Sequence, residues 1–216
     1  MPRIPRDEIR ISVDVETSGP SPTTGSLLSV GACLVDDPER AFYRELRPVE
    51  GMPWDRGTER VHGLTRRHLA DAGVDPAVAM AELAAWVDEV APAPARPVFV
   101  GFNAPFDWMF VADYLHRFVG RNPFGHGALD LKAVYLGRHG IARWAETTQQ
   151  HVRVHHPVDA PHTHHALDDA REQAALARAL LAFPGRSADE VPEAGDGSEV
   201  DGAGREASLA DDAVAP

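Results

Sequence analysis

The sequence predicts an α/β fold in which a mixed five-stranded sheet is flanked by helices. Three short apolar segments with the alternation of β-strands occupy the first quarter of the chain. Segments with strand and helix character then alternate, which is typical of parallel strands joined by crossover helices. The chain has 216 residues with 44% hydrophobic and 25% charged content, as expected for an ordinary globular domain.

The first half of the chain supplies three strands and two helices. We expect strands at residues 9–15, 27–35 and 41–47, separated by turns rich in Gly, Pro and Asp. Such short connections favour antiparallel neighbours. A short helix is expected near 65–71 and a long amphipathic one at 75–90, with a proline at a first helical position.

The second half continues as strand, helix, strand, helix. A Pro/Ala spacer leads into a fourth strand at 97–102 and a helix at 107–118, followed by a short strand at 128–130 and a helix at 131–136. A polar loop is expected at 147–163. The last element is a helix at 163–183, whose apolar positions repeat at helical spacing.

Four acidic side chains stand near the ends of these elements. Asp14 and Glu16 alternate at the end of the first strand, so they point to the same side of it. Two carboxylates on one face repel, and a hard divalent cation relieves the repulsion. Asp107 follows the fourth strand and Asp169 lies in the last helix. If the four converge, they can hold two Mg²⁺ or Mn²⁺ ions about 4 Å apart.

These residues resemble the motifs of the DEDDh branch of the 3′→5′ exonucleases, the group of polymerase proofreading subunits, RNase T and oligoribonuclease. The matching positions are Asp14, Glu16 and Thr17, then Asn103, Phe106 and Asp107, then His164 and Asp169. The segment from Val61 to Thr65 resembles a turn that many members carry. The resemblance covers roughly residues 8 to 183. It implies a ribonuclease-H-like fold and metal-dependent release of nucleoside 5′-monophosphates from the 3′ end of single-stranded or short nucleic acid.

The same resemblance implies a role for each motif residue. Asp14 would bridge both ions, and Asp107 would hold the second ion. Glu16 and Asp169 would ligate the first ion or its water. His164 would be the general base, a task that suits an imidazole with an ordinary pKa of about 6.5.

Substrate contacts are expected from five side chains. Thr17 could bind the terminal 3′-hydroxyl, as it does in the resembled family. Trp54, in a loop, and His62 could stack on bases, an interaction that tolerates any sequence. Phe106 could do the same, with core packing as the alternative. Asn103 is expected to support the backbone near the site.

Two adjacent histidines compete for the role of general base. The position five residues before Asp169 lies in the loop that enters the helix, which favours His164. His165 is then expected to be merely solvated, although the sister branch of the family carries a Tyr at that position. Six histidines fall within residues 151–165, and a zinc site is the alternative. The only cysteine, Cys33, lies far away in an apolar strand, so a polar loop is favoured.

The charge is uneven along the chain. The net charge of −12 is unusual for an enzyme that binds phosphates. Residues 187–216 hold nine acidic residues and one Arg, a net of −8, which leaves −4 for residues 1–186. We therefore expect an exonuclease domain at 1–186 and an acidic disordered tail at 187–216. A weakly charged body favours short or single-stranded substrates over long duplexes.

The sequence also bears on the location of the protein, its partners and two alternative functions. There is no signal segment and no apolar run of about 18 residues, so a cytoplasmic location is expected. DNA or RNA preference, a homodimer and association with a polymerase stay open. One alternative function is a non-catalytic nucleic-acid-binding or polymerase-associated module of the same fold, which would not need four repelling carboxylates. Another is an endonuclease of the ribonuclease H type, which would not need His164.

Overall fold

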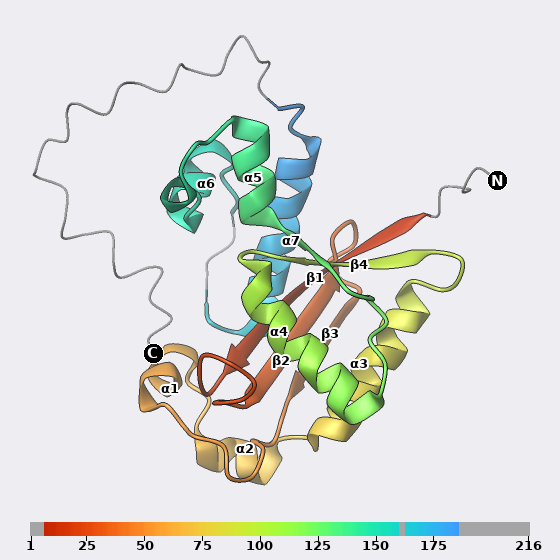
Figure 1. Ribbon diagram of the computed structural model, residues 1–216, viewed down its shortest axis with the longest axis vertical. Coiled ribbons are helices and arrows are strands. Elements are labelled where there is room, and N and C mark those ends of the chain that lie inside the picture. The colour runs from red at the N-terminus through yellow and green to blue at the C-terminus, as the bar shows by residue number, and fades with distance from the viewer. Residues whose placement is uncertain (1–6, 160–162, 186–216) are drawn as a thin grey trace, which may run out of the picture.

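The computed structural model describes residues 7–159 and 163–185 and is built around a five-stranded sheet (Figure 1). The strand order is β3-β2-β1-β4-β5. The strands are β1 (Glu8–Thr17), β2 (Leu27–Leu34), β3 (Ala41–Glu45), β4 (Arg96–Gly101) and β5 (Ala128–Asp130). β2 is antiparallel to both β1 and β3, whereas β4 is parallel to β1 and to β5. The predicted mixed sheet is confirmed.

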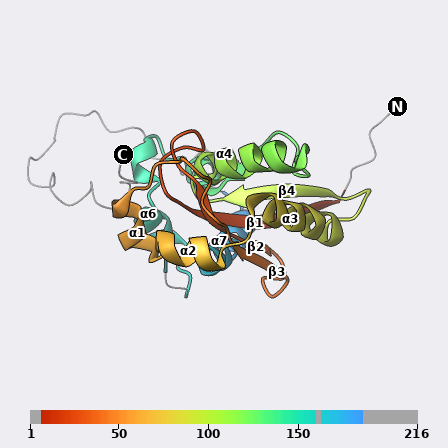
Figure 2. The same cartoon turned by 90° about the horizontal axis from the view of Figure 1, so that it is seen from below.

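Helices cover both faces of this sheet. They are α1 (Arg56–His62), α2 (Arg66–Ala72), α3 (Pro76–Val90), α4 (Ala104–Tyr114), the π-helical turn η1 (Leu115–Val119), α5 (Leu131–His139), the 3-10 turn η2 (Trp144–Glu146), α6 (Gln149–His155) and α7 (Ala166–Ala182). α3 and α4 share one hydrophobic cluster with β1, and α5 and α7 share another with β2 and β4. Figure 2 shows α4 and α7 on opposite sides of the sheet.

Alternation along β1 decides which residues face which layer. Ile11, Val13 and Val15 are buried in the cluster with α3 and α4. Burial of such a side chain stabilises the fold by about 1.5–3 kcal/mol. The intervening positions, among them Asp14 and Glu16, therefore point to the other face, toward α7. The strand thus presents an apolar side to the core and its acidic residues to a helix.

The start of α7 lies directly on β2, at a position without a side chain. A Cβ atom built on Gly31 would lie 2.3 Å from the carbonyl carbon of Ala166 and from the backbone nitrogen of Leu167. Such a distance leaves no room for any side chain. Gly31 pairs with Asp14 of β1 in the sheet. The glycine therefore lets the first turn of α7 approach the strand end that carries Asp14.

Several chain segments meet at one edge of the sheet. β1, β4 and β5 are parallel, so their carboxyl ends lie at the same edge. α4 and α5 begin directly after β4 and β5 at this edge. Ligands of α/β proteins commonly bind at such an edge. The fold therefore brings together the segments that carry the motif residues.

Two helices begin at other positions than the sequence predicted. α4 begins at Ala104, three positions before Asp107, because Asn103 adopts a left-handed conformation with φ 60° and turns the chain into the helix. The last helix begins at Ala166 rather than at residue 163. His164 has φ 56°, which is incompatible with a right-handed helix, so it stays in the entry loop.

Two further helices were not predicted. α1 begins after Asp55, whose side chain accepts from the Gly57 backbone, and ends at Gly63 in a left-handed turn. The expected polar loop at 147–163 is wrong for its first part, which forms α6. Val152 of this helix is fully buried, because α6 packs on α5 and α7. His162 and the expected tail at 187–216 lie outside the described residues.

In the described part of the chain, no helix combines the length and the hydrophobicity needed to cross a bilayer.

Candidate active site

Asp14 is the centre of an acidic group at the edge of the sheet. Burial raises the pKa of Asp14 well above its ordinary value. The carboxylates of Asp107, Glu16 and Asp169 raise this pKa further, in that order. Electrostatic effects of this kind require short distances. The structure therefore brings together the four carboxylates that the sequence singled out.

Asp107 projects from the first turn of α4 and is tied to β1. Its Oδ1 atom accepts a hydrogen bond of 3.1 Å from the backbone nitrogen of Val15, the residue between Asp14 and Glu16. Burial raises the pKa of Asp107 to about 8, although the Val15 bond lowers it, and Asp130 adds to the increase. An acidic group with such a pKa is protonated at neutral pH unless a cation compensates its charge.

Glu16, His164 and Asp169 form a second part of the group. One ligand atom from each of these three side chains lies within 4.8 Å of the others. Asp169 is buried, and its Oδ1 atom accepts a hydrogen bond of 2.9 Å from the backbone nitrogen of Thr163. His164 is exposed in the loop that enters α7. Carboxylate oxygens with one imidazole nitrogen are a donor set that divalent cations accept.

The adjacent histidine has a different environment. His165 stacks on Tyr43 of β3, with ring centroids 4.5 Å apart and an interplanar angle of 29°. Its Nδ1 atom also lies 3.3 Å from a carboxylate oxygen of Asp168. The expectation that His165 is merely solvated is wrong, because β3 presents Tyr43 to the start of α7. Of the two histidines, only His164 belongs to the group with Glu16 and Asp169.

Thr17 and His62 lie beside the acidic group. The Thr17 hydroxyl donates a hydrogen bond of 2.9 Å to the Gly19 carbonyl, and the residue is buried. Burial lowers the pKa of His62. His164 lowers it further, whereas Glu59 and the Thr17 backbone raise it. His62 is therefore close both to the end of β1 and to the loop before α7.

The other three expected substrate contacts differ in their surroundings. Phe106 is partly buried against the core, with its ring centroid 5.5 Å from that of Phe110, as the packing alternative predicts. Asn103 forms no side-chain cap and supplies the left-handed turn into α4. Trp54 is half-buried, and its indole nitrogen donates to Oε2 of Glu59 at 2.7 Å. Trp54 also lines a pocket together with residues of α1 and α2.

Two polar residues at the site were not found from the sequence. Gln173 is 6% exposed, and its amide nitrogen donates a hydrogen bond of 2.6 Å to Oδ1 of Asp14. Its amide oxygen accepts from the Phe102 backbone at 3.0 Å. Asp130 accepts from the backbone of Ala104 at 3.3 Å and so holds the start of α4. The one signal in the sequence is that Gln173 stands four residues after Asp169, on the same helix face.

Three other described histidines, His139, His155 and His156, form contacts with one another or with Tyr135. His139 and His156 are buried and share a hydrogen bond of 2.7 Å between their Nε2 atoms. Nδ1 of His155 lies 2.8 Å from the Tyr135 hydroxyl. In residues 7–159 and 163–185, the only group of three or more potential metal ligands is Glu16, His164 and Asp169.

A ribonuclease-H-like sheet with four converging carboxylates and a histidine is the arrangement of a DEDDh-type exonuclease. The chain matches the model of the RNase_T family, described as exonuclease, over residues 11–177, and it belongs to this family. It is 42% identical over 176 residues to the 3′-5′ DNA exonuclease Cap18 of Escherichia coli. That match covers 80% of this chain and 91% of the relative. The resemblance stated from the motifs is confirmed, and the protein is a 3′→5′ exonuclease.

Solved structures agree in fold at lower identity. The nuclease domain of 3′hExo, a DEDDh family member bound to rAMP, has a TM-score of 0.65 and 13% identity, covering 82% of this chain and 94% of that domain. E. coli exonuclease I in complex with a dT13 oligonucleotide has a TM-score of 0.62 and 17% identity. That match covers 82% of this chain but 42% of exonuclease I, so this chain corresponds to less than half of that protein.

Proposed function

We propose that the protein degrades single-stranded DNA from the 3′ end, with two Mg²⁺ or Mn²⁺ ions held by Asp14, Glu16, Asp107 and Asp169. The observation that carries this proposal is the burial of Asp14 among the three other carboxylates. DNA as the substrate is supported by the 42% identical relative, which is a DNA exonuclease. The complex of exonuclease I with dT13 supports a single strand.

The donor atoms fit hard divalent cations. All four carboxylates offer oxygen, which Mg²⁺ and Mn²⁺ prefer. Burial and mutual repulsion raise the pKa of Asp14, and burial raises that of Asp107. Both shifts are unfavourable for ionised carboxylates, and a bound cation removes this penalty. The acidic group is therefore better suited to a metal-bound than to a metal-free protein.

The side chains around the group have separable tasks. Divalent cations held by the four carboxylates would supply activation of a water for attack on phosphorus and neutralisation of charge on the leaving 3′ oxygen. Exposed His164, beside Glu16 and Asp169, takes the proton of the attacking water. Gln173 fixes the orientation of Asp14 through its 2.6 Å hydrogen bond. Each task depends on positions that are set by the first turns of α7.

The terminal nucleotide is proposed to bind between the end of β1 and α1. The Thr17 hydroxyl donates its proton to the Gly19 carbonyl, so its oxygen is left to accept a hydrogen bond from the terminal 3′-hydroxyl. The Nδ1 atom of His62 accepts from the Leu64 backbone at 3.0 Å, which leaves Nε2 as its donor. A neutral imidazole with a lowered pKa suits stacking on a base. Phe106 and Asn103 are not assigned a contact with this nucleotide, since Phe106 packs against Phe110 and Asn103 forms the turn into α4.

A matched pair of aspartates tests the assignment. Asp169→Asn should abolish the shortening of a 5′-labelled single-stranded DNA, whereas Asp168→Asn should keep it. Asp168 is half-exposed and contacts His165 and Arg171 rather than the acidic group. An RNA strand of the same sequence should be cleaved more slowly by the wild type. Equal loss in both variants would contradict the site, and a preference for RNA would contradict the DNA proposal.

Three expectations from the sequence stay predictions. A homodimer or an association with a polymerase would be detected as an increased molar mass in light scattering of the purified chain, alone and with a polymerase added. The cytoplasmic location is measured by fractionation. The division into a domain at 1–186 and an acidic tail at 187–216 is measured by limited proteolysis.

A further inference from the structure

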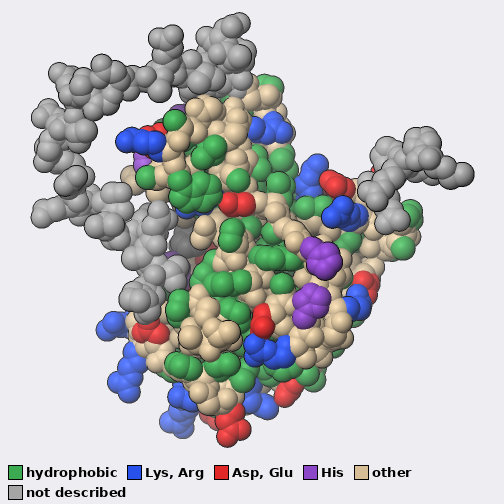
Figure 3. Space-filling view, in the orientation of Figure 1, with side chains coloured by type: hydrophobic (Ala, Val, Ile, Leu, Met, Phe, Trp, Pro, Cys, Tyr) green, Lys and Arg blue, Asp and Glu red, His purple; other side chains and the backbone are tan. Residues whose placement is uncertain are grey.

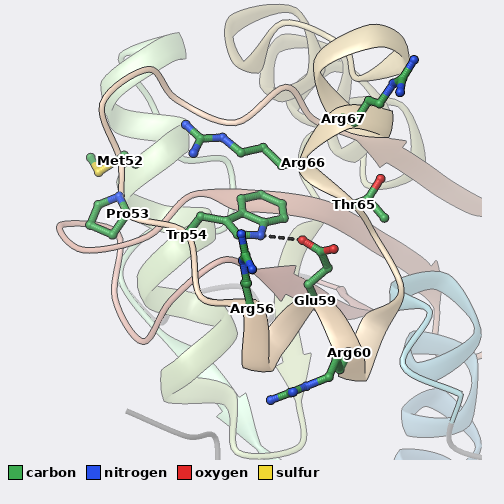
Figure 4. Close-up of a pocket in the computed structure, with 9 residues that line it drawn as sticks. All are labelled: Met52, Pro53, Trp54, Arg56, Glu59, Arg60, Thr65, Arg66 and Arg67. Atoms are coloured by element: carbon green, nitrogen blue, oxygen red, sulfur yellow. Dashed lines mark hydrogen bonds between the residues drawn. The ribbon is translucent and has the colours of Figure 1, made fainter.

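A pocket of about 720 Å³ opens beside the active site, between the loop at 51–55, α1 and the start of α2 (Figure 4). Six of the lining side chains have functional groups that matter for binding. They are Trp54, Glu59 and the arginines Arg56, Arg60, Arg66 and Arg67. Sites that bind single-stranded nucleic acid commonly combine aromatic rings with basic side chains, as this pocket does.

The pocket is basic in an acidic chain. Residues 51–67 hold four arginines against Asp55 and Glu59, a net charge of +2, while the chain as a whole has −12. Figure 3 shows basic side chains gathered at the lower left, over α1 and α2. Among the described residues, no carboxylate pairs with Arg56, Arg60 or Arg66. Their guanidinium groups therefore keep their hydrogen-bonding capacity for an anionic ligand.

The indole of Trp54 is held in place from two directions. Its ring nitrogen donates a hydrogen bond of 2.7 Å to Oε2 of Glu59. The residues on either side of Trp54 are bonded to Ser18. The Ser18 hydroxyl donates to the Pro53 carbonyl at 3.1 Å, and the Asp55 nitrogen donates to the Ser18 carbonyl at 3.0 Å. A fixed aromatic ring loses little conformational entropy when a base stacks on it.

These bonds also connect the pocket to the acidic group. Ser18 follows Thr17 directly at the end of β1, two residues after Glu16. α1 joins the two places, with Arg56 at its beginning and His62 at its end. Its seven residues span about 10 Å. The pocket therefore lies within a few nucleotides of the carboxylates along a bound strand.

We propose that this pocket, formed by Trp54 and the four arginines, is a second binding site for the substrate strand, upstream of the 3′-terminal nucleotide. It rests on the proposed function and specifies where the rest of the strand binds. The arginines contact phosphates, and Trp54 stacks on one base. Neither contact reads sequence, so the site increases affinity for strands of any sequence that are long enough to reach it.

The test removes charge from the pocket and, in a matched control, from the opposite edge of the sheet. The pocket variant is Arg56→Ala/Arg60→Ala/Arg66→Ala. The control variant is Arg40→Ala/Arg96→Ala/Arg121→Ala. Arg40 and Arg121 form exposed ion pairs with Glu89 and Asp88, which contribute little to stability, and Arg96 begins β4 at the far end from the carboxylates. Both variants lose the same charge, so only position distinguishes them.

Binding of a fluorescein-labelled oligothymidylate of about 15 nucleotides is measured by fluorescence anisotropy. EDTA is present so that binding is measured without cleavage of the strand. The slope of log Kd against log salt should fall by about 2 in the pocket variant, because each phosphate contact contributes about 0.7. Trp54→Ala should weaken binding roughly 5- to 150-fold, and Trp54→Phe should restore most of it. The control variant should bind with a slope reduced by less than half as much. An unchanged slope in the pocket variant, or equal slopes in the two variants, would overturn the proposal.

Kinetics separate this inference from the proposed function. In the pocket variant, KM for the long strand should rise about tenfold or more at unchanged kcat, while cleavage of a dinucleotide should stay unchanged. Equal loss on both substrates would overturn the proposal. A wild type that cleaves neither substrate would refute the proposed function, and the anisotropy result would still decide the pocket. Tighter binding by the pocket variant would show that the pocket binds acidic residues of the chain itself, which also overturns the proposal.

Discussion

Gly31→Ala should inactivate the enzyme although position 31 carries no functional group. The new Cβ atom would lie 2.3 Å from backbone atoms of Ala166 and Leu167. Ordinary contacts between such atoms are about 3.5 Å, so the two backbones must separate by about 1 Å. β2 cannot retreat, because it is hydrogen-bonded to β1 on one side and to β3 on the other. The first turn of α7 therefore has to move, and Asp169 moves with it.

The expected magnitudes follow from this displacement. Overpacking of a well-packed interior costs about 1–3 kcal/mol of folding free energy, so the chain should still fold. A shift of about 1 Å in a catalytic arrangement lowers kcat about 100-fold. Metal affinity should fall as well, since Asp169 and Glu16 would no longer face one ion. The variant is expected to be a folded protein with a defective site.

Melting temperature, metal affinity by calorimetry and kcat on single-stranded DNA measure these effects. Gly137→Ala is the matched control, because Gly137 lies inside α5 and nothing lies within 4 Å of the position that its new Cβ atom would take. That substitution should stabilise the protein by about 0.5–1 kcal/mol through helix propensity and leave kcat unchanged. If Gly31→Ala has the kcat and the melting temperature of the wild type, the close contact between α7 and β2 at position 31 would be refuted.

Three other predictions concern the acidic group. Gln173→Leu should lower metal affinity about 10- to 100-fold by calorimetry with the fold retained, because Asp14 loses the group that orients it. His164→Ala should lower kcat by about 10² to 10⁴ with metal binding kept, whereas His165→Ala should cost about 1 kcal/mol of stacking in denaturant melts and little activity. In EDTA, stability should fall as pH rises from about 4 toward 8. Folded Asp107, with its pKa raised to about 8, retains a proton that the unfolded chain loses near its ordinary pKa. Asp107 contributes at most about 1.4 kcal/mol per pH unit to the slope of the unfolding free energy against pH. This slope should become shallower in Asp107→Asn, and an unchanged slope would contradict the raised pKa.

The sheet was predictable because its signals are local. Alternating apolar residues and short turns give the strands, and the same alternation places Asp14 and Glu16 on one side of β1. α6 was missed because its apolar face is small and depends on packing against α5 and α7. Its capping by Thr148 is the one local sign of this helix. The starts of α4 and α7 were misplaced because two non-glycine residues adopt positive φ, which sequence patterns rarely reveal.

The site was predictable to the extent that family motifs name its residues. The four carboxylates and His164 were identified in this way, and the structure brings them together. Gln173 could not be assigned, because its partners Asp14 and Phe102 lie far away in the sequence. The stacking of His165 on Tyr43 also depends on how α7 packs against β3. Contacts of this kind are set by tertiary packing and leave no local pattern.

The most direct test of the carboxylate site uses a single-stranded DNA labelled on its 3′-terminal nucleotide, with products resolved over time after Mn²⁺ is added. We predict that the first labelled product is a nucleoside 5′-monophosphate, and that EDTA or Asp14→Asn prevents its release. Release of label in excess EDTA would contradict the role of the carboxylates. Labelled fragments longer than one nucleotide appearing first would contradict exonuclease action from the 3′ end.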